Sequence, residues 1–450
     1  MKENKVSYNF GAKGWGLICY EIVLLFFMTG LTVDGLNIIV PQMAAYHGWN
    51  ADTILSISTP AGIVALFLVL FWGKFIKLWG LKRVTVVTMF LAAVSMVLYG
   101  HSVSVAMYAI MLVLVVTFIN AFATTCGFAI CANWFPTKKG IVMGFVTIGM
   151  NLASALISLI LNALSTKFNI ATALTIMGLV IAVVAVLIQL CVKATPEEAG
   201  CYPDNDPEVA ELIHKEEAII KERNIAEISY KEALTNPKVW IFGIAYGCFG
   251  LATVGIMSQL VSYFMEVRSF EQQTAILTVT VAAVIGMLGS VLWGIVDQKI
   301  GTKWASVAFG VWYFVGIIFL LMPNTACMYV GIFMLGFAIG GNGNFAPSMA
   351  SYAFGRRDFA VSYSCINMIV GIVRSLSFVV LAALRAAFQG YTVPYVVFAI
   401  ISLVGGIMLA FVKVQMKVGS WEESDEEPAQ TAKSKQREVT NIPNTPQVDG

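Results

Sequence analysis

The sequence predicts an all-α integral membrane protein with twelve transmembrane helices in two six-helix bundles. Of its 450 residues, 58% are apolar and 12% are charged, and its mean hydropathy is +0.80. An ordinary soluble domain has about 25% charged residues. Apolar runs of about 20 residues, the length that crosses a bilayer as a helix, recur twelve times. The predicted spans are residues 15–40, 54–73, 84–100, 104–132, 141–165, 170–193, 239–264, 274–297, 304–322, 326–352, 360–387 and 391–413.

One long charged segment divides these spans into six and six. The predicted units are an N-terminal bundle (1–193), a cytoplasmic linker (194–238), a C-terminal bundle (239–413) and a disordered cytoplasmic tail (414–450). Within the linker, the spacing of Glu and Lys between Asp206 and Asn224 predicts a solvated helix. We expect the linker to be a flexible tie without chemistry of its own, and the polar tail has too few apolar residues to fold.

The distribution of basic residues predicts the orientation. With the N-terminus in the cytoplasm, all but four of the 28 Lys and Arg residues fall on the cytoplasmic side. This asymmetry follows the positive-inside rule, and an even number of spans places both termini in the cytoplasm. The N-terminal segment has no small-residue cleavage site before the first span, so we expect that span to be retained in a multi-pass protein of the cell membrane.

Two loops repeat the same spacing between glycines. The first runs from Gly73 to Gly80 after span 2, and the second runs from Gly294 to Gly301 after span 8, 221 residues later. Basic pairs also recur, Lys138 with Lys139 before span 5 and Arg356 with Arg357 before span 11. Repeated halves around a central binding site are typical of transporters.

These glycine loops resemble the signature loops of the major facilitator superfamily, and the resemblance in topology covers all twelve spans. Three further segments resemble its oxalate/formate antiporter and monocarboxylate transporter branch: WFPTKKG at 134–140, FGRR at 354–357 and TPEEAGCYP at 195–203. The resemblance implies alternating access, in which two halves rock about a site between them without nucleotide hydrolysis. It also implies that one chain suffices for function, so we expect a monomer.

The sequence departs from the family pattern at two places. The signature loop usually carries an acid four residues after its first glycine, but Lys77 and Gln298 stand there, with Asp297 one place early. Lys77 and Asp297 are therefore candidate gating residues, although the usual latching charge pair is not predicted. The branch implies basic residues on spans 11 and 8 for a dicarboxylate, and only Arg374 on span 11 matches. One cation suggests a substrate with one carboxylate.

Arg374 lies near the centre of an apolar segment, 360–384. A guanidinium at mid-membrane depth is disfavoured by roughly 2.5–3.5 kcal/mol or more, so such residues usually face a bundle interior or a wet cavity. At helical spacing, Tyr363, Asn367 and Ser377 share its face. We expect this polar stripe to line a cavity where Arg374 binds an anion; the alternative is an inter-helix staple to a carboxylate or carbonyls.

Span 1 contains two acidic residues, Glu21 and Asp34, at opposite depths. Both are candidates for coupling or gating. For Glu21, nearer the cytoplasmic side, pairing with a loop lysine is the favoured interpretation. For Asp34, nearer the outer side, a proton or cation site competes with an outer gate or a structural role at the helix end.

The remaining site candidates are uncharged. The glycine-rich segment 340–347 should loosen the helix of span 10. Backbone groups freed in this way are tolerated in a membrane only beside protein or a watery cavity, so the two asparagines of the segment are candidates for substrate binding or gating. The alternative is that the glycines allow close packing of helices. A dinucleotide site is excluded because no strand precedes the glycines. Polar residues on other spans either bind substrate or join helices. The substrate-binding candidates besides the span 11 stripe are Asn342, Asn344, Asn120, Asn151, Tyr246 and Gln259.

The most consistent function is secondary transport of a small organic anion, by exchange or with a proton. Alternatives are a carrier of a zwitterion such as a betaine, and a channel or transporter-derived sensor. We expect no enzyme, because the three histidines lie in loops and neither HExxH nor GxxxxGK[ST] occurs. The eight cysteines form no CxxC pair, so no metal, disulfide or cofactor is predicted. The expected partners are the lipid bilayer and the solute, not nucleic acid.

Overall fold

The computed structural model describes residues 8–414, so the predicted tail lies almost entirely outside the described residues. Within them, eleven helical stretches are long and apolar enough to cross a membrane, and Thr325–Gly341 is a shorter apolar helix. The stretch Phe345–Phe388 has 44 residues, about 66 Å at 1.5 Å per residue and twice the bilayer core. Gly355, with φ of 69°, breaks it. It therefore belongs to two crossings, and the twelve predicted crossings agree with the structure.

The first group of helices forms six crossings, two of which contain a π-helical turn. These are η1 in the first crossing and η2 in the fourth. In chain order the elements are α1 (Gly11–Thr29), η1 (Gly30–Asp34), α2 (Leu36–His47), α3 (Ala51–Trp79), α4 (Leu81–Gly100), α5 (Val105–Asn120), η2 (Ala121–Gly127), α6 (Phe128–Trp134), α7 (Lys139–Val146), α8 (Ile148–Lys167) and α9 (Ile170–Cys191).

Short helices connect this group to the second one. They are η3 (Glu197–Ala199), η4 (Pro203–Asn205), α10 (Pro207–Glu222) and α11 (Tyr230–Thr235). The Asp206 side chain accepts a hydrogen bond from the Glu208 backbone and caps α10, which confirms the helix predicted there. The second group contains α12 (Pro237–Met257), α13 (Leu260–Arg268), α14 (Gln272–Ile300), α15 (Thr302–Leu321), α16 (Thr325–Gly341), α17 (Phe345–Ser375), α18 (Ser377–Phe388) and α19 (Thr392–Phe411).

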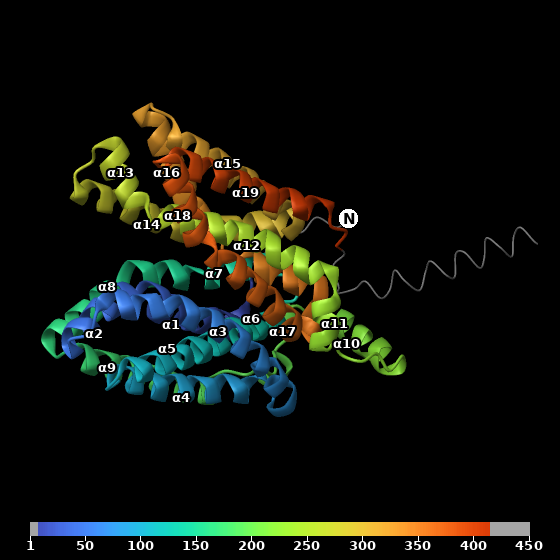
Figure 1. Ribbon diagram of the computed structural model, residues 1–450. Coiled ribbons are helices and arrows are strands. Elements are labelled where there is room, and N and C mark those ends of the chain that lie inside the picture. Colours follow the sequence, from blue (N-terminus) through green and yellow to red (C-terminus); the bar gives the residue numbers. More distant parts are fainter. Residues whose placement is uncertain (1–7, 415–450) are drawn as a thin grey trace, which may run out of the picture.

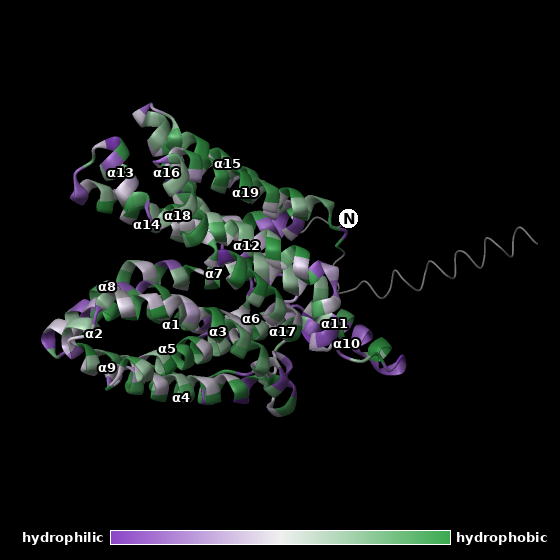
Figure 2. Ribbon diagram, in the orientation of Figure 1, coloured by the Kyte–Doolittle hydropathy of each residue, from purple (hydrophilic) through white to green (hydrophobic). Residues whose placement is uncertain are grey.

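The two groups meet at one end of the molecule and diverge toward the other (Figure 1). We call the end that carries α10 and α11 the linker end, and the opposite one the distal end. At the distal end α2, α13 and α18 make their main contacts within their own group. Across the groups, α14 packs on α7 and α8, and α17 packs on α3. The hydrophobic colouring runs along the helices, whereas hydrophilic residues gather at connections and at the linker end (Figure 2).

Glycines allow the closest approach between the groups. A Cβ atom on Gly144 of α7 would lie 2.7 Å from the carbonyl oxygen of Ser290 and 2.9 Å from Cα of Gly294, both on α14. Real Cβ atoms do not come so near to backbone, so only glycine fits at this crossing. This close packing of α7 on α14 joins the two groups.

Candidate functional site

Arg374 lies in the last turn of α17, and its side chain is exposed. Its aliphatic stem packs on Gly250 of α12, where an added Cβ would meet Cβ, Cγ and Cδ of Arg374 at 3.3–3.4 Å. Within residues 8–414 the guanidinium makes no hydrogen bond or ion pair, and its electrostatic neighbour is the phenol of Tyr363. In the described part of the chain, Arg374 therefore does not form the inter-helix contact with a carboxylate that was the alternative to anion binding.

The other arginines near the distal end are occupied. Arg268 donates hydrogen bonds to the carbonyl oxygens of Leu320 (2.8 Å) and Pro323 (3.2 Å). Arg385 donates to Oε1 of Gln259 (3.1 Å), and its Nη2 lies 3.5 Å from Oε2 of Glu266. Gln259, a candidate for substrate binding, is therefore engaged with Arg385. These contacts lie within the second group and leave Arg374 as the candidate anion site.

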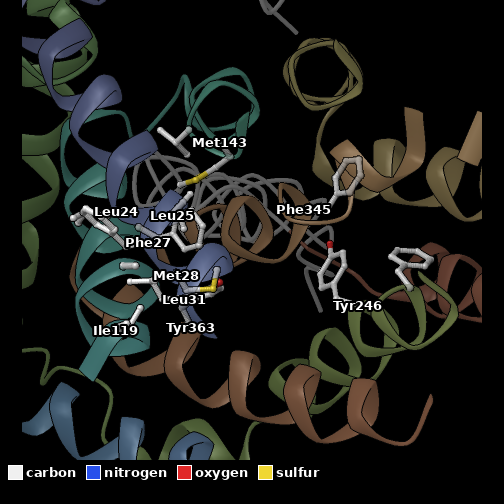
Figure 3. Packing of buried hydrophobic residues seen from close by; sticks show 14 of the residues in the cluster. Leu24, Leu25, Phe27, Met28, Leu31, Ile119, Met143, Tyr246, Phe345 and Tyr363 are labelled. Carbon is white, nitrogen blue, oxygen red and sulfur yellow. The ribbon is translucent and has the colours of Figure 1, made fainter. Parts of the chain in front are cut away.

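Tyr363 lies between the groups and is 4% exposed. Its ring stacks on Phe359 at 5.2 Å between centroids and meets the edge of Phe128, on α6 of the first group, at 5.6 Å. Figure 3 labels Tyr363 among the buried residues of the hydrophobic cluster. Asn367, one turn further along α17, is half-buried. Of the polar stripe predicted on span 11, Tyr363 therefore faces the junction of the two groups.

The side chain of Glu21, on α1, is fully enclosed by the protein. It is 0% exposed, and both carboxylate oxygens lack a hydrogen-bond partner in the described part of the chain. The carboxyl fills the space left by Gly127 in η2, where a Cβ would collide with it. The expected pairing with a loop lysine is not formed, because the side chain turns into the bundle and away from the loops.

Asp34 is better partnered than Glu21. It ends the π-helical turn η1, and its Oδ2 accepts a hydrogen bond of 2.6 Å from Oγ of Ser154 on α8. The residue is half-buried. Single π-helical turns inside α-helices are frequent at functional sites, and both η1 and η2 went unpredicted because side-chain periodicity does not reveal a local change in backbone winding.

Two of the predicted asparagines belong to a hydrogen-bond network between the groups. Asn344 accepts from Thr147 Oγ1 of the first group and donates to the Ser290 carbonyl oxygen at 2.7 Å. Asn151 of the first group donates to Ser290 Oγ at 2.9 Å, and that hydroxyl donates to the Gly340 carbonyl oxygen at 2.9 Å. Residues 342–344 interrupt the helix between α16 and α17, as the glycines predict. Asn151 and Asn344 thus take part in contacts between the groups, and substrate binding by either residue stays a prediction.

The other uncharged candidates make contacts within one group. Asn120 donates to the Val116 carbonyl oxygen at 2.8 Å and is half-buried. Tyr246 is 4% exposed, and its hydroxyl lies 3.0 Å from Oγ of Ser306. Asn342 lies in the break after α16 and is half-buried. The structure does not bring Tyr246 to the junction where Tyr363 lies, since the hydroxyl of Tyr246 joins α12 to α15.

Asp297 and Gln298, near the end of α14, contact the first group. Asp297 is 2% exposed, accepts from Thr302 Oγ1 at 2.6 Å, and lies against Gly140 of the first group. Gln298 donates to the Thr137 carbonyl oxygen of that group at 2.9 Å. Asp297 and Gln298 thus contact the first group, and the gating role of Asp297 stays a prediction.

The linker itself supplies ion pairs to both groups. Glu227 lies 3.0 Å from Lys77 of the first group and 3.8 Å from Arg357 of the second, and Glu197 lies 2.9 Å from Arg356. Sequence reasoning missed both glutamates and treated the linker as a passive tie. The basic residue at an expected acidic position, Lys77, was the available signal that an acid had to come from elsewhere.

The family model described as Major Facilitator Superfamily matches residues 22–377 and, in a second match, 273–444. The chain belongs to the major facilitator superfamily. Superfamily members are secondary transporters and not enzymes, so the chain is a multi-pass membrane transporter for a small molecule.

Several known superfamily proteins are similar to this transporter. An uncharacterized MFS-type transporter of Escherichia coli K12, YhjX, is 23% identical over 305 residues, which is 67% of this chain and 71% of YhjX. The crystal structure of FucP in the outward conformation has a TM-score of 0.65 at 14% identity, covering 88% of this chain and 98% of FucP. The human organic anion transporter MFSD10 has a TM-score of 0.64 at 12% identity, covering 87% and 97%. These structures share the fold.

Proposed function

We propose that the protein carries a small organic anion with one carboxylate across the cell membrane by alternating access. The observation that carries this proposal is Arg374, a permanent cation within a membrane-crossing segment that no acidic side chain of residues 8–414 neutralises. A guanidinium at membrane depth is disfavoured unless it meets water or an anion. A substrate carboxylate offsets that cost, and the planar guanidinium binds it through two parallel hydrogen bonds.

The number of free cations limits the substrate's charge. Arg268 is held by carbonyl oxygens and Arg385 by Gln259 and Glu266. A second carboxylate on the substrate would therefore be desolvated without a matching cation at this site. A monocarboxylate supplies the one negative charge that Arg374 needs, beside the phenol of Tyr363.

The contacts between the groups support an outward-facing state if the linker end is cytoplasmic, as the basic residues predict. Ion pairs of the linker and the hydrogen bonds from Thr147 to Asn344 and from Asn151 to Ser290 hold the groups together. Reorientation requires these contacts to break while the distal ends approach. Such contacts are weak enough to exchange, since exposed ion pairs contribute about 0–1 kcal/mol each.

Ligand binding to the purified protein tests the proposal. A thermal-shift screen compares formate, acetate, lactate, oxalate, succinate and glycine betaine, because a ligand that binds only the folded state raises its melting temperature. We expect monocarboxylates to raise it and dicarboxylates to have less effect. Stabilisation by betaine alone would favour the zwitterion carrier, and no stabilisation by any carboxylate would contradict the proposal.

Substitution of Arg374 locates the site. Arg374→Gln should weaken carboxylate binding by at least about tenfold, since a charge-assisted hydrogen bond contributes roughly 1.5–3 kcal/mol. Arg374→Lys should retain part of it because the charge remains without the fork. Arg83→Gln, the same exchange at an exposed position, is the matched control and should bind normally. Unchanged affinity in Arg374→Gln would remove Arg374 from the site.

A further inference from the structure

We propose that Glu21 is the proton-binding site of this transporter and that Tyr363 couples it to the anion at Arg374. The inference rests on the proposed function for its anion half, and it names the ion that moves with the substrate. It assigns proton symport, whereas the proposed function leaves exchange and symport open.

The enclosure of Glu21 supports a proton there. Its side chain is fully buried, and neither carboxylate oxygen has a hydrogen-bond partner within residues 8–414. An ionised carboxylate in such a place loses its hydration with nothing in exchange, at a cost of several kcal/mol. The neutral acid avoids most of that cost, so the carboxyl holds a proton in this conformation.

The groups that face Glu21 do not replace that proton with a positive charge. They are Tyr20 on α1, Cys126 in η2, Cys131 in α6 and Tyr363 on α17. All four are neutral at physiological pH. The cationic residues of the helices packed against α1 are engaged elsewhere: Lys139 of α7 lies 4.3 Å above the ring of Tyr352, and Lys167 of α8 lies against Phe168.

Tyr363 connects this carboxyl to the anion site. Its phenol is an electrostatic neighbour of both the Glu21 carboxyl and the Arg374 guanidinium. While no anion is bound, the positive charge of Arg374 favours the ionised form of Glu21. A bound anion cancels that charge and so favours the protonated form. The anion and the proton therefore each raise the affinity of the protein for the other. One proton passes from the outer solution to Glu21 and leaves to the cytoplasm after reorientation. A monocarboxylate and a proton together carry no net charge, so each transport cycle moves no net charge across the membrane.

Asp34 is the competing site, and its geometry is less favourable. Its carboxylate already accepts a hydrogen bond from Ser154 and is half-buried. A hydrogen bond to the ionised form stabilises that form. Glu21 has neither the hydrogen bond nor the solvent contact.

Infrared spectroscopy of the purified protein tests the proton site without a substrate. We expect a carbonyl stretch from a protonated carboxyl group at neutral pH, which Glu21→Gln reduces and Glu211→Gln, a substitution on exposed α10, leaves intact. Glu21→Asp retains a carboxyl at this place and should keep the band if Gln disturbs folding. A band of undiminished intensity in Glu21→Gln would overturn the proposal.

Transport tests the coupling, with lactate as the probe. In wild-type vesicles, lactate entry should carry protons inward, and lactate affinity should fall about tenfold per pH unit above the titration of Glu21, as one linked proton requires. Glu21→Gln should exchange lactate without proton movement and with affinity independent of pH. Proton movement that persists in Glu21→Gln overturns the inference. Absence of lactate binding with the infrared result intact would instead contradict the anion proposal.

Discussion

Oε2 of Glu227 lies 3.0 Å from Nζ of Lys77, and the same ammonium group donates to the Ile228 carbonyl oxygen at 3.0 Å. Oε1 of Glu227 is 3.8 Å from Nε of Arg357 in the other half. Family signature loops usually have an acid where Lys77 stands. In this chain the linker contributes the acid, and one carboxylate bridges two basic helix ends that would otherwise repel each other.

Reversal of the Glu227 charge should loosen the linker end. Because the two pairs of Glu227 are partly exposed, each contributes at most about 1 kcal/mol. We therefore expect Glu227→Lys, which breaks both, to shift the balance of conformations by up to about thirtyfold. Hydrogen exchange measures this at the Ile228 amide, which donates to Asp358 Oδ1 at 3.0 Å. It should exchange faster in the variant.

Two further variants separate the bridge from general charge effects. Glu211→Lys makes the same change in an exposed i,i+4 pair with Lys215 on α10 and should leave the Ile228 amide unaffected. Lys77→Glu combined with Glu227→Lys should restore slow exchange. Slow exchange in Glu227→Lys alone would show that the bridge does not close this end.

The glycine crossing of α7 and α14 predicts a stronger effect. Gly144→Leu places a side chain against the Ser290 carbonyl oxygen and Gly294 Cα, and overpacking costs about 1–3 kcal/mol. Separation of the halves at the linker end relieves this clash, so amides of residues 137–146 should exchange at least about fivefold faster. Gly62→Leu on α3 is the control, because a Cβ there meets nothing within 4 Å. Unchanged protection in Gly144→Leu would mean that the helices accommodate leucine in place.

The crossings were predictable from sequence because a run of about 20 apolar residues is nearly sufficient for a membrane helix. The break at Asn342–Asn344 was also predictable, since glycines mark where such a helix loosens. The placement of Arg374 and Tyr363 close to one face of the helix follows from helical periodicity.

The surroundings of Glu21 were not predictable in this way. Its burial depends on the glycine at 127, which lies more than a hundred residues away on a π-helical turn that local patterns do not indicate. The linker contacts were missed for a related reason, because a solvated, charged segment can have many different sequences. Only the tertiary structure shows that Glu227 reaches both halves and that Glu197 reaches the second. Pairings between distant segments leave no periodic signal.

The pair of Glu197 and Arg356 predicts how acid affects the linker end. Partial burial raises the pKa of Glu197, but hydrogen bonds from Arg356 (2.9 and 3.2 Å), together with those from Thr195 and the backbone, outweigh burial and hold the pKa below its usual range. A lowered pKa means that the ionised form favours the folded state. This contribution is complete above the unfolded pKa of about 4.3 and is lost as the pH falls through the lower folded value.

Melting temperatures of wild type and Arg356→Gln, followed from neutral to acidic pH, measure this contribution. The wild type should melt higher at neutral pH, and the difference should shrink below about pH 4 as Glu197 gains its proton. Added salt should reduce it too, because Glu197 is 38% exposed in its side chain and exposed pairs are screened. Glu198→Gln removes a charge from the adjacent residue without touching this pair, so it should leave the pH dependence of the difference unchanged. A difference between wild type and Arg356→Gln that stays constant through the acid range would show that Arg356 stabilises the linker end by packing alone.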